Sequence, residues 1–199
     1  MSITSFLNNR GFYCFEGYSQ EISAQINDLI TIIGLANTSP INAMEIGFNA
    51  GHSADVFLKN HKDLTLTSFD LGLYKYVPFA KEYIDTTYPN RHKLILGDSR
   101  ITIPIYLQNN KDTKFDIIFI DGGHDYEIAK DDMENCFYLA HNDTIVIMDD
   151  TIFTEGWEQP YTIGPTRTWT EQLQQKKIIE INRIDYWRGR GMSWGKYAF

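Results

Sequence analysis

The sequence has few cysteines and no long apolar run, and each shortage excludes a class of protein. Its two cysteines, Cys14 and Cys136, have neither the CxxC nor the Cys/His spacing of a zinc site. We therefore expect a reduced, cytoplasmic setting in which both thiols act as small structural hydrophobes. No apolar run approaches the roughly 20 residues of a membrane-spanning helix, and residues 1–17 lack the pattern of a signal peptide.

Basic residues are also in short supply, which argues against a nucleic-acid partner. There are 18 Lys and Arg against 26 Asp and Glu, and the formal net charge is −8. Binding along a phosphate backbone requires clustered basic side chains. The main basic concentration is interpreted as a solvated face; it comprises Arg183, Arg188, Arg190 and Lys196. The 199 residues, 43% of them hydrophobic, are typical of one globular domain.

Within that single domain, residues 1–40 differ in pattern from residues 41–199. The first part has an aromatic lead from Phe6 to Tyr18 and a helical apolar spacing from Glu21 to Leu35. We expect this part to pack on the core; covering the site or forming a homodimer are the alternatives. The second part carries the functional motifs.

Residues 41–199 alternate between apolar strands and helices. Five strands are predicted, at Ile41–Ile46, Leu64–Phe69, Lys93–Leu96, Phe115–Ile120 and Thr144–Met148. Strands this apolar, separated by helices, indicate a parallel sheet covered on both faces. Two further strands flank a glycine-containing turn at Arg188–Gly191. The expected fold is α/β: a Rossmann-like, open, mostly parallel sheet with a C-terminal antiparallel hairpin.

Each of the five strands runs into glycine or aspartate. These residues are Gly47, Asp70, Asp98, Asp121 and Asp149. In an open α/β sheet, ligands bind beyond the carboxyl ends of the strands. We therefore expect the acidic residues to lie along one edge of the sheet, at the functional site.

The turn after the first strand, Glu45–Gly51, contains a candidate nucleoside-binding loop. It fails as the dinucleotide motif G-x-G-x-x-G, because Asn49 and His52 occupy the second and third glycine positions. It fits E-x-G-x-x-x-G, with glycine at Gly47 and Gly51. An ordinary glycine-rich turn is the alternative interpretation.

Two further strand ends offer contacts to a nucleoside. Asp70 follows Gly51 by 19 residues, and an acidic residue about 20 positions after the glycines is the usual partner of ribose hydroxyls. Asp98 and Ser99 end the third strand, where a polar group can reach an adenine amino group. Either residue could instead cap the helix that begins near Arg100.

The ends of the fourth and fifth strands carry the candidate catalytic residues. Asp121 and His124 follow one strand, and Asp149 and Asp150 end the next. Three converging carboxylates disfavour joint ionisation unless a cation such as Mg²⁺ neutralises them. Alternatively, Asp149 and Asp150 cap the next segment, since adjacent strand residues point to opposite faces unless the chain turns. His124 is a candidate general base, or a support that donates to Asp121 or Asp150.

Together these motifs resemble the class I S-adenosylmethionine-dependent methyltransferases, most closely the small metal-dependent O-methyltransferases of the macrolide-sugar and catechol types. The resemblance implies that S-adenosylmethionine contacts Glu45, Gly47, Asn49, Gly51, Asp70, Asp98, Ser99 and Asp121. It implies Mg²⁺ at Asp121, Asp149 and Asp150, and catalysis by His124 with Asp121. Histidine where catechol-type enzymes have lysine favours a sugar or another aliphatic hydroxyl as acceptor. Asn49 departs from the family pattern, which has glycine there.

Two aromatic loops, Leu71–Phe79 and Thr151–Gly164, are candidate lids over the site, or they cover the core. The leading hypothesis is an O-methyltransferase that acts on a hydroxyl of a sugar, a glycan or another small molecule. A nicotinamide-dependent Rossmann oxidoreductase is disfavoured by the failed glycine motif. A non-catalytic cofactor-binding module is the third hypothesis.

Overall fold

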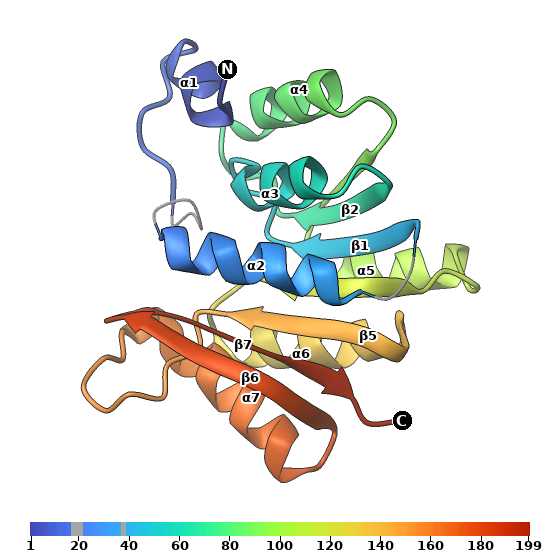
Figure 1. Cartoon of the computed structure of the whole chain (residues 1–199), viewed down its shortest axis with the longest axis vertical. Helices are drawn as coiled ribbons and strands as arrows, with labels where there is room; N and C mark the ends of the chain where they lie inside the picture. Colours follow the sequence, from blue (N-terminus) through green and yellow to red (C-terminus); the bar gives the residue numbers. More distant parts are fainter. Residues whose placement is uncertain (17–21, 37–38) are drawn as a thin grey trace.

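A computed structural model describes residues 1–16, 22–36 and 39–199. These residues form a seven-stranded sheet in the order β3-β2-β1-β4-β5-β7-β6 (Figure 1). The strands are β1 (Ile41–Ile46), β2 (Leu64–Asp70), β3 (His92–Leu96), β4 (Phe115–Ile120), β5 (Ala140–Asp149), β6 (Ile178–Trp187) and β7 (Arg190–Tyr197). Neighbouring strands from β1 to β5 pair in parallel, whereas β7 runs antiparallel to both β5 and β6.

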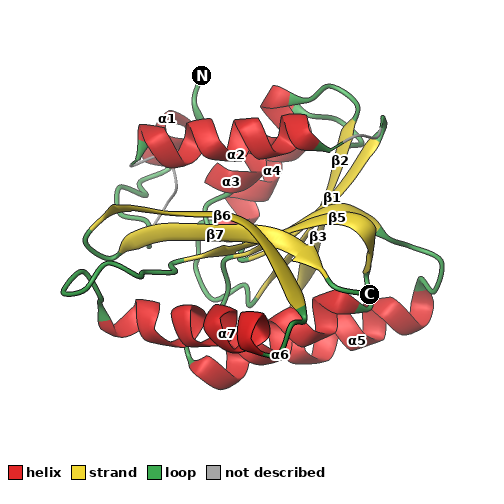
Figure 2. Ribbon diagram, turned by 60° about the horizontal axis from the view of Figure 1, so that its bottom comes forward, coloured by secondary structure: helices red, strands yellow, loops and turns green. Residues whose placement is uncertain are grey.

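Helices cover both faces of this sheet (Figure 2). One face carries α1 (Ile3–Asn8), α2 (Ser23–Leu35), α3 (His52–Asn60) and α4 (Val77–Thr87). The other carries α5 (Ser99–Asn109), α6 (Tyr126–Phe137) and α7 (Ile163–Gln174), with a short 3₁₀ turn at Pro160–Thr162 before α7. The expected Rossmann-like sheet with an antiparallel C-terminal hairpin is confirmed.

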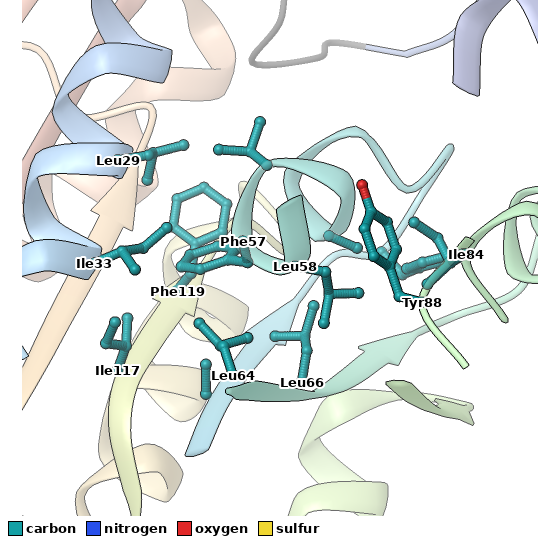
Figure 3. Packing of buried hydrophobic residues seen from close by; sticks show 14 of the residues in the cluster. Leu29, Ile33, Phe57, Leu58, Leu64, Leu66, Ile84, Tyr88, Ile117 and Phe119 are labelled. Atoms are coloured by element: carbon teal, nitrogen blue, oxygen red, sulfur yellow. The ribbon is translucent and has the colours of Figure 1, made fainter. Parts of the chain in front are cut away.

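The central strands are buried on both faces, so their side chains alternate between two hydrophobic cores. Ile117 and Phe119 of β4 pack beneath α2 and α3, beside Leu29 and Phe57 (Figure 3). The intervening Ile118 belongs to the second core, under α5, α6 and α7. This two-sided burial explains why the strand sequences are continuously apolar rather than alternating.

The N-terminal part packs on the first of these cores. Ile3 and Leu7 of α1 are fully buried, as is Leu29 of α2. The expected positions Tyr18 and Glu21 lie outside the described residues. Within the described ranges, no helix combines the length and the apolar character needed to cross a membrane.

The cysteines and the first candidate lid differ from the expectations. Cys136 is buried, but Cys14 is exposed, so the expectation of two structural thiols is wrong for Cys14. The C-terminal residues of the loop Leu71–Phe79 are helical, because α4 begins at Val77 with Pro78 in its first turn. Proline fits there, since the first-turn N–H groups have no partner within the helix.

Candidate active site

The carboxyl ends of the parallel strands surround a cavity of about 430 Å³. Eight of the predicted site residues line it: Gly47, Asn49, Asp70, Asp98, Ser99, Asp121, His124 and Asp150. They come from five different strand ends. The cavity therefore lies at the edge of the sheet where the sequence predicts the site.

Gly47 joins the loop after β1 directly to the end of β4. Its φ is +99°, and a Cβ atom at this position would lie 1.8 Å from the Asp121 carbonyl oxygen. The two strands are hydrogen-bonded neighbours, and Asp121 N donates to Ile46 O at 2.9 Å. Glycine is therefore required for both conformation and space, and its backbone is left open to a ligand.

Asp70 organises two loops at the cavity wall. Its carboxylate accepts hydrogen bonds from Asn49 N at 2.8 Å and from Gly72 N at 2.7 Å. A carboxylate has about four lone-pair positions, so two backbone donors leave acceptor capacity for ligand hydroxyls. Asp70 is thus held in place without being fully occupied.

Asp98 combines the two roles that the sequence left open. It is the N-cap of α5, where its side chain accepts from Arg100 N at 3.0 Å, and it also lines the cavity. The Arg100 guanidinium pairs with it at 2.6 Å and lowers the pKa of the Asp98 carboxyl. Ser99, the first residue of α5, lies beside it at the cavity wall.

Glu45 and Gly51, also expected to contact the cofactor, do not line the cavity. The fully buried Glu45 accepts from Ser53 Oγ at 2.7 Å and Ser68 Oγ at 2.6 Å, and burial raises its pKa to about 7. Gly51, with φ +75°, is the N-cap of α3 and packs against Ile3. Both residues therefore stabilise the glycine loop through contacts on the side away from the cavity.

Asp121, His124 and Asp150 form a cluster at the other end of the cavity. Each offers one ligand atom, and these atoms all lie within 4.8 Å of one another. His124 Nε2 is 3.0 Å from Asp150 Oδ2. Asp150 has φ +55°, so the chain turns here. This turn separates the directions of Asp149 and Asp150.

Asp149 is not part of this cluster. Its Oδ1 accepts from Gln25 Nε2 of α2 at 2.7 Å. Asp149 does line a small adjoining pocket together with Asp121, His124 and Asp150, so a metal site at the three carboxylates stays a prediction. Asp149 nevertheless lies close enough to add negative charge, and it raises the pKa of Asp121.

Burial and like charges dominate the electrostatics of the cluster. Burial, followed by the charges of Asp149 and Asp150, raises the pKa of Asp121 well above its usual range. Burial and Asp150 raise the pKa of Asp149 to about 7. The hydrogen bond to Asp150 raises the pKa of His124. These raised pKa values show that joint ionisation of the carboxyls in and beside the cluster is disfavoured.

Arg190, at the start of β7, is the basic side chain on this side of the cavity. Its Nη1 lies 3.9 Å from Asp150 Oδ1, and its side chain is 15% exposed. The interpretation as a solvated face is therefore wrong for Arg190. Asp150 Oδ1 is buried with no hydrogen-bond partner among the described residues. An orphaned carboxylate oxygen beside other oxygen ligands fits a hard divalent cation such as Mg²⁺.

Glu16 and Arg190 line the cavity although the sequence did not single them out as binding residues, whereas Tyr74 and Tyr161 belong to the two candidate lids. Glu16 and Tyr74 line the cavity beside the glycine loop. The Tyr161 ring lies 5.6 Å from that of His124, and its hydroxyl donates to Gly189 O at 3.0 Å. Each candidate lid therefore contributes one tyrosine near the site, although no motif marks which one.

A glycine loop, a strand-end aspartate and an acidic cluster lie at the carboxyl edge of an open α/β sheet, the place where Rossmann-like proteins bind their ligands. The sequence profile of the methyltransferase-domain family matches residues 44–151, more than half of the chain. The chain belongs to this family. The prediction of a class I methyltransferase is thereby confirmed. A comparison with curated protein sequences finds no significant match.

Solved O-methyltransferases have the same fold at low sequence identity. A Staphylococcus aureus protein assigned as a caffeoyl-CoA O-methyltransferase superposes with a TM-score of 0.76 at 17% identity, covering 100% of this chain and 93% of that one. An O-methyltransferase from Bacillus cereus, in complex with SAH, gives 0.75 at 15%, covering 98% and 88%. The TDP-rhamnose 3′-O-methyltransferase CalS11 gives 0.66 at 19%, covering 89% and 82%. At these identities the likeness establishes the fold.

Proposed function

We propose that the protein transfers a methyl group from S-adenosylmethionine to a hydroxyl of a small molecule, with a sugar as the favoured acceptor and Mg²⁺ as the assisting ion. The observation that carries the proposal is the placement of the Asp121–His124–Asp150 cluster in the same cavity as Gly47 and Asp70. One end of the cavity fits a nucleoside, and the other fits a cation beside a base.

The nucleoside end supplies directional acceptors and open backbone. Asp70 accepts from ribose hydroxyls through lone pairs that Asn49 N and Gly72 N leave available. Asp98 and Ser99 face the base, and Gly47 allows close approach of the backbone to the ligand. These contacts select a nucleoside without a ribose phosphate, because a phosphate would meet the Asp70 carboxylate.

At the chemical end, Asp121 and Asp150 would hold the cation, and His124 would accept the proton of the acceptor hydroxyl. When bound, S-adenosylmethionine supplies an electrophilic methyl group, and a divalent cation favours the ionised form of a nearby hydroxyl. His124 would accept the proton at Nδ1, because its Nε2–H donates to the Asp150 carboxylate at 3.0 Å, which stabilises the imidazolium. The charges of Asp149 and Arg190 act on the pKa of Asp121: Asp149 raises it and Arg190 lowers it.

Two observations support a sugar as acceptor. The Tyr161 ring lies beside His124, where an aromatic face can pack on the C–H face of a pyranose. CalS11, which shares the fold, is a TDP-rhamnose 3′-O-methyltransferase. The nicotinamide-dependent alternative lacks support, since neither the glycine loop nor the family favours it. A cytoplasmic setting and a homodimer stay predictions.

Calorimetric titration with S-adenosylmethionine, with and without Mg²⁺, tests the proposal. We expect binding to the wild type in both conditions, and an Mg²⁺ response that Asp121→Asn abolishes. Methyl transfer is then assayed against a panel of nucleotide sugars and simple glycosides. Absence of cofactor binding under every condition contradicts the proposal; binding without transfer or any Mg²⁺ response favours a non-catalytic module.

A further inference from the structure

The N-terminal segment reaches the cavity, and its last described residues lie against the glycine loop. We call residues 12–16 the N-terminal strap. In Figure 1 the chain after α1 descends along the side of the molecule to which the arrowheads of β1 and β5 point. Glu16, at the end of the strap, lines the cavity together with Asn49 and Tyr74.

Hydrogen bonds from two loops hold Glu16 in this position. Asn49 Nδ2 donates to the Glu16 carbonyl oxygen at 2.5 Å, and the Tyr74 hydroxyl donates to the Glu16 carboxylate. The Tyr76 hydroxyl in turn donates to Asn49 Oδ1 at 2.5 Å. Phe15 packs edge-on against the rings of His52 and Tyr76, each at 5.4 Å. The strap is therefore fixed by polar and aromatic contacts at once.

These contacts explain why asparagine occupies the middle of the loop. Asn49 has φ +46°, a left-handed conformation that asparagine tolerates better than most residues other than glycine. Its backbone N–H serves Asp70, and its side-chain amide links the strap to Tyr76. A glycine would permit the same turn but could not tie the strap to it.

The charge pattern of the cavity gives the Glu16 carboxylate a ligand-directed role. Two arginines line the cavity, and both lie opposite other carboxylates: Arg100 pairs with Asp98, and Arg190 lies beside Asp150. Glu16 instead receives a neutral hydroxyl from Tyr74. A carboxylate retains acceptor capacity after one such bond, and an ammonium group is its strongest common partner.

We propose that Glu16 is a binding residue for the α-ammonium group of the amino-acid portion of the cofactor, and that the strap delivers it there. The inference rests on the proposed function. Asp70, Asp98 and Ser99 provide for the nucleoside, whereas Glu16 lies at the glycine loop, where the amino-acid portion remains to be held. The strap lies outside residues 44–151, the part of the chain that the family profile matches.

Two ligands separate this role from a structural one. S-Adenosylhomocysteine contains the amino-acid portion, whereas 5′-methylthioadenosine has the same thioether nucleoside without it. We expect Glu16→Gln to weaken S-adenosylhomocysteine binding about tenfold, as the loss of a charge-assisted hydrogen bond does. Binding of 5′-methylthioadenosine should not change. Both affinities are measured by calorimetry, and the melting temperature checks the fold.

Glu82→Gln is the matched control. Glu82 pairs with Arg10 of the same N-terminal segment at 2.9 Å, but it does not line the cavity. It should leave both affinities unchanged. Asn49→Gly, which keeps the turn and removes the tie, should weaken S-adenosylhomocysteine binding by a few fold and also spare 5′-methylthioadenosine.

The outcomes distinguish this inference from the proposed function. If the wild type binds neither ligand, the proposed function fails and takes the inference with it. If the wild type binds S-adenosylhomocysteine and Glu16→Gln binds it equally well, only the inference is overturned. Equal weakening of both ligands by Glu16→Gln also overturns it, because the residue would then act on the nucleoside or on the fold.

Discussion

The carboxylates at the two ends of the cavity differ in their hydrogen-bond partners. At the nucleoside end, Asp70 accepts from two backbone N–H groups, and Asp98 accepts from Arg100. At the chemical end, the half-buried Asp121 lies among like charges, and Asp150 Oδ1 has no hydrogen-bond partner among the described residues. Backbone and guanidinium donors therefore meet the carboxylates of the first end, whereas the carboxylates of the second end lie beside one another, with His124 and Arg190 as their charged neighbours.

The difference follows from where the donors are. N–H groups of the loops after β1 and β2, and of the helix after β3, donate to the carboxylates there. The carboxylates after β4 and β5 meet each other, with Arg190 and His124 as partial compensation. Preorganised acceptors suit the recognition of neutral hydroxyls, and an uncompensated cluster suits a divalent cation. Variants at each end should therefore separate binding from chemistry.

The largest effect on turnover should come from His124→Ala. Loss of a positioned general base lowers the rate by about 10² to 10⁴-fold. Cofactor affinity should stay within about twofold, because the nucleoside end is untouched. Methyl-transfer kinetics with the acceptor found in the panel, together with calorimetry, measure the two quantities. Full activity in this variant contradicts the base assignment.

Gly47→Ala should lower the free energy of unfolding, because it disturbs the contact between the loop after β1 and the end of β4. A methyl group would overlap the Asp121 carbonyl oxygen, at 1.8 Å, and the backbone has φ +99°. We expect a loss of about 4 kcal/mol or more in the free energy of unfolding. Gly34→Ala is the control: its Cβ would meet nothing within 4 Å, and alanine in α2 should stabilise by about 0.5–1 kcal/mol. Urea denaturation compares them, and equal stability of the two variants would contradict the packing described here.

Glu45→Gln should change how the stability of the protein depends on pH, because Glu45 is a buried carboxyl. The pKa of Glu45 is raised from 4.5 to about 7, so the folded state binds its proton more tightly than the unfolded state. Its contribution to stability is present below pH 4.5 and is lost as the pH rises to about 7, a change on the order of 3 kcal/mol. The variant should therefore gain stability relative to wild type between pH 5 and pH 8. Parallel pH profiles of unfolding for the two proteins would refute this.

Asp70→Asn should have a smaller effect, confined to binding. An amide accepts through one oxygen only, so one of the two backbone N–H groups or a ribose hydroxyl loses its partner. We expect S-adenosylhomocysteine to bind about tenfold more weakly, which is about 1.4 kcal/mol. The Mg²⁺ response should persist. Loss of that response in Asp70→Asn would show that the two ends are not separable.

Much of the sheet was predictable, because local patterns decide it. The apolar runs Ile41–Ile46 and Phe115–Ile120 coincide with β1 and β4, and Gly47 and Asp121 follow them directly. Helices α4 and α7 were missed, since aromatic and polar residues there resemble loops. The sheet edge that holds the site was predictable for the same reason as the strands.

The exact membership of the site was less predictable, because it depends on side-chain direction and on distant segments. Asp149 and Asp150 are adjacent, and the turn at Asp150 decides which of them joins His124. Arg190 returns to the cavity from a hairpin, and Glu16 comes from a segment without a recognisable motif. No local pattern encodes these long-range placements.

The central claim is that the cluster at the chemical end binds a divalent cation. The most direct measurement is the melting temperature of the cofactor-free protein as Mg²⁺ is titrated, in the wild type and in Asp150→Asn, with Asp98→Asn as a control from the nucleoside end. A ligand that binds only the folded state raises its stability with concentration. The account predicts a saturable rise in wild type and Asp98→Asn that Asp150→Asn abolishes. A wild type indifferent to Mg²⁺, or a rise that survives in Asp150→Asn, would contradict it.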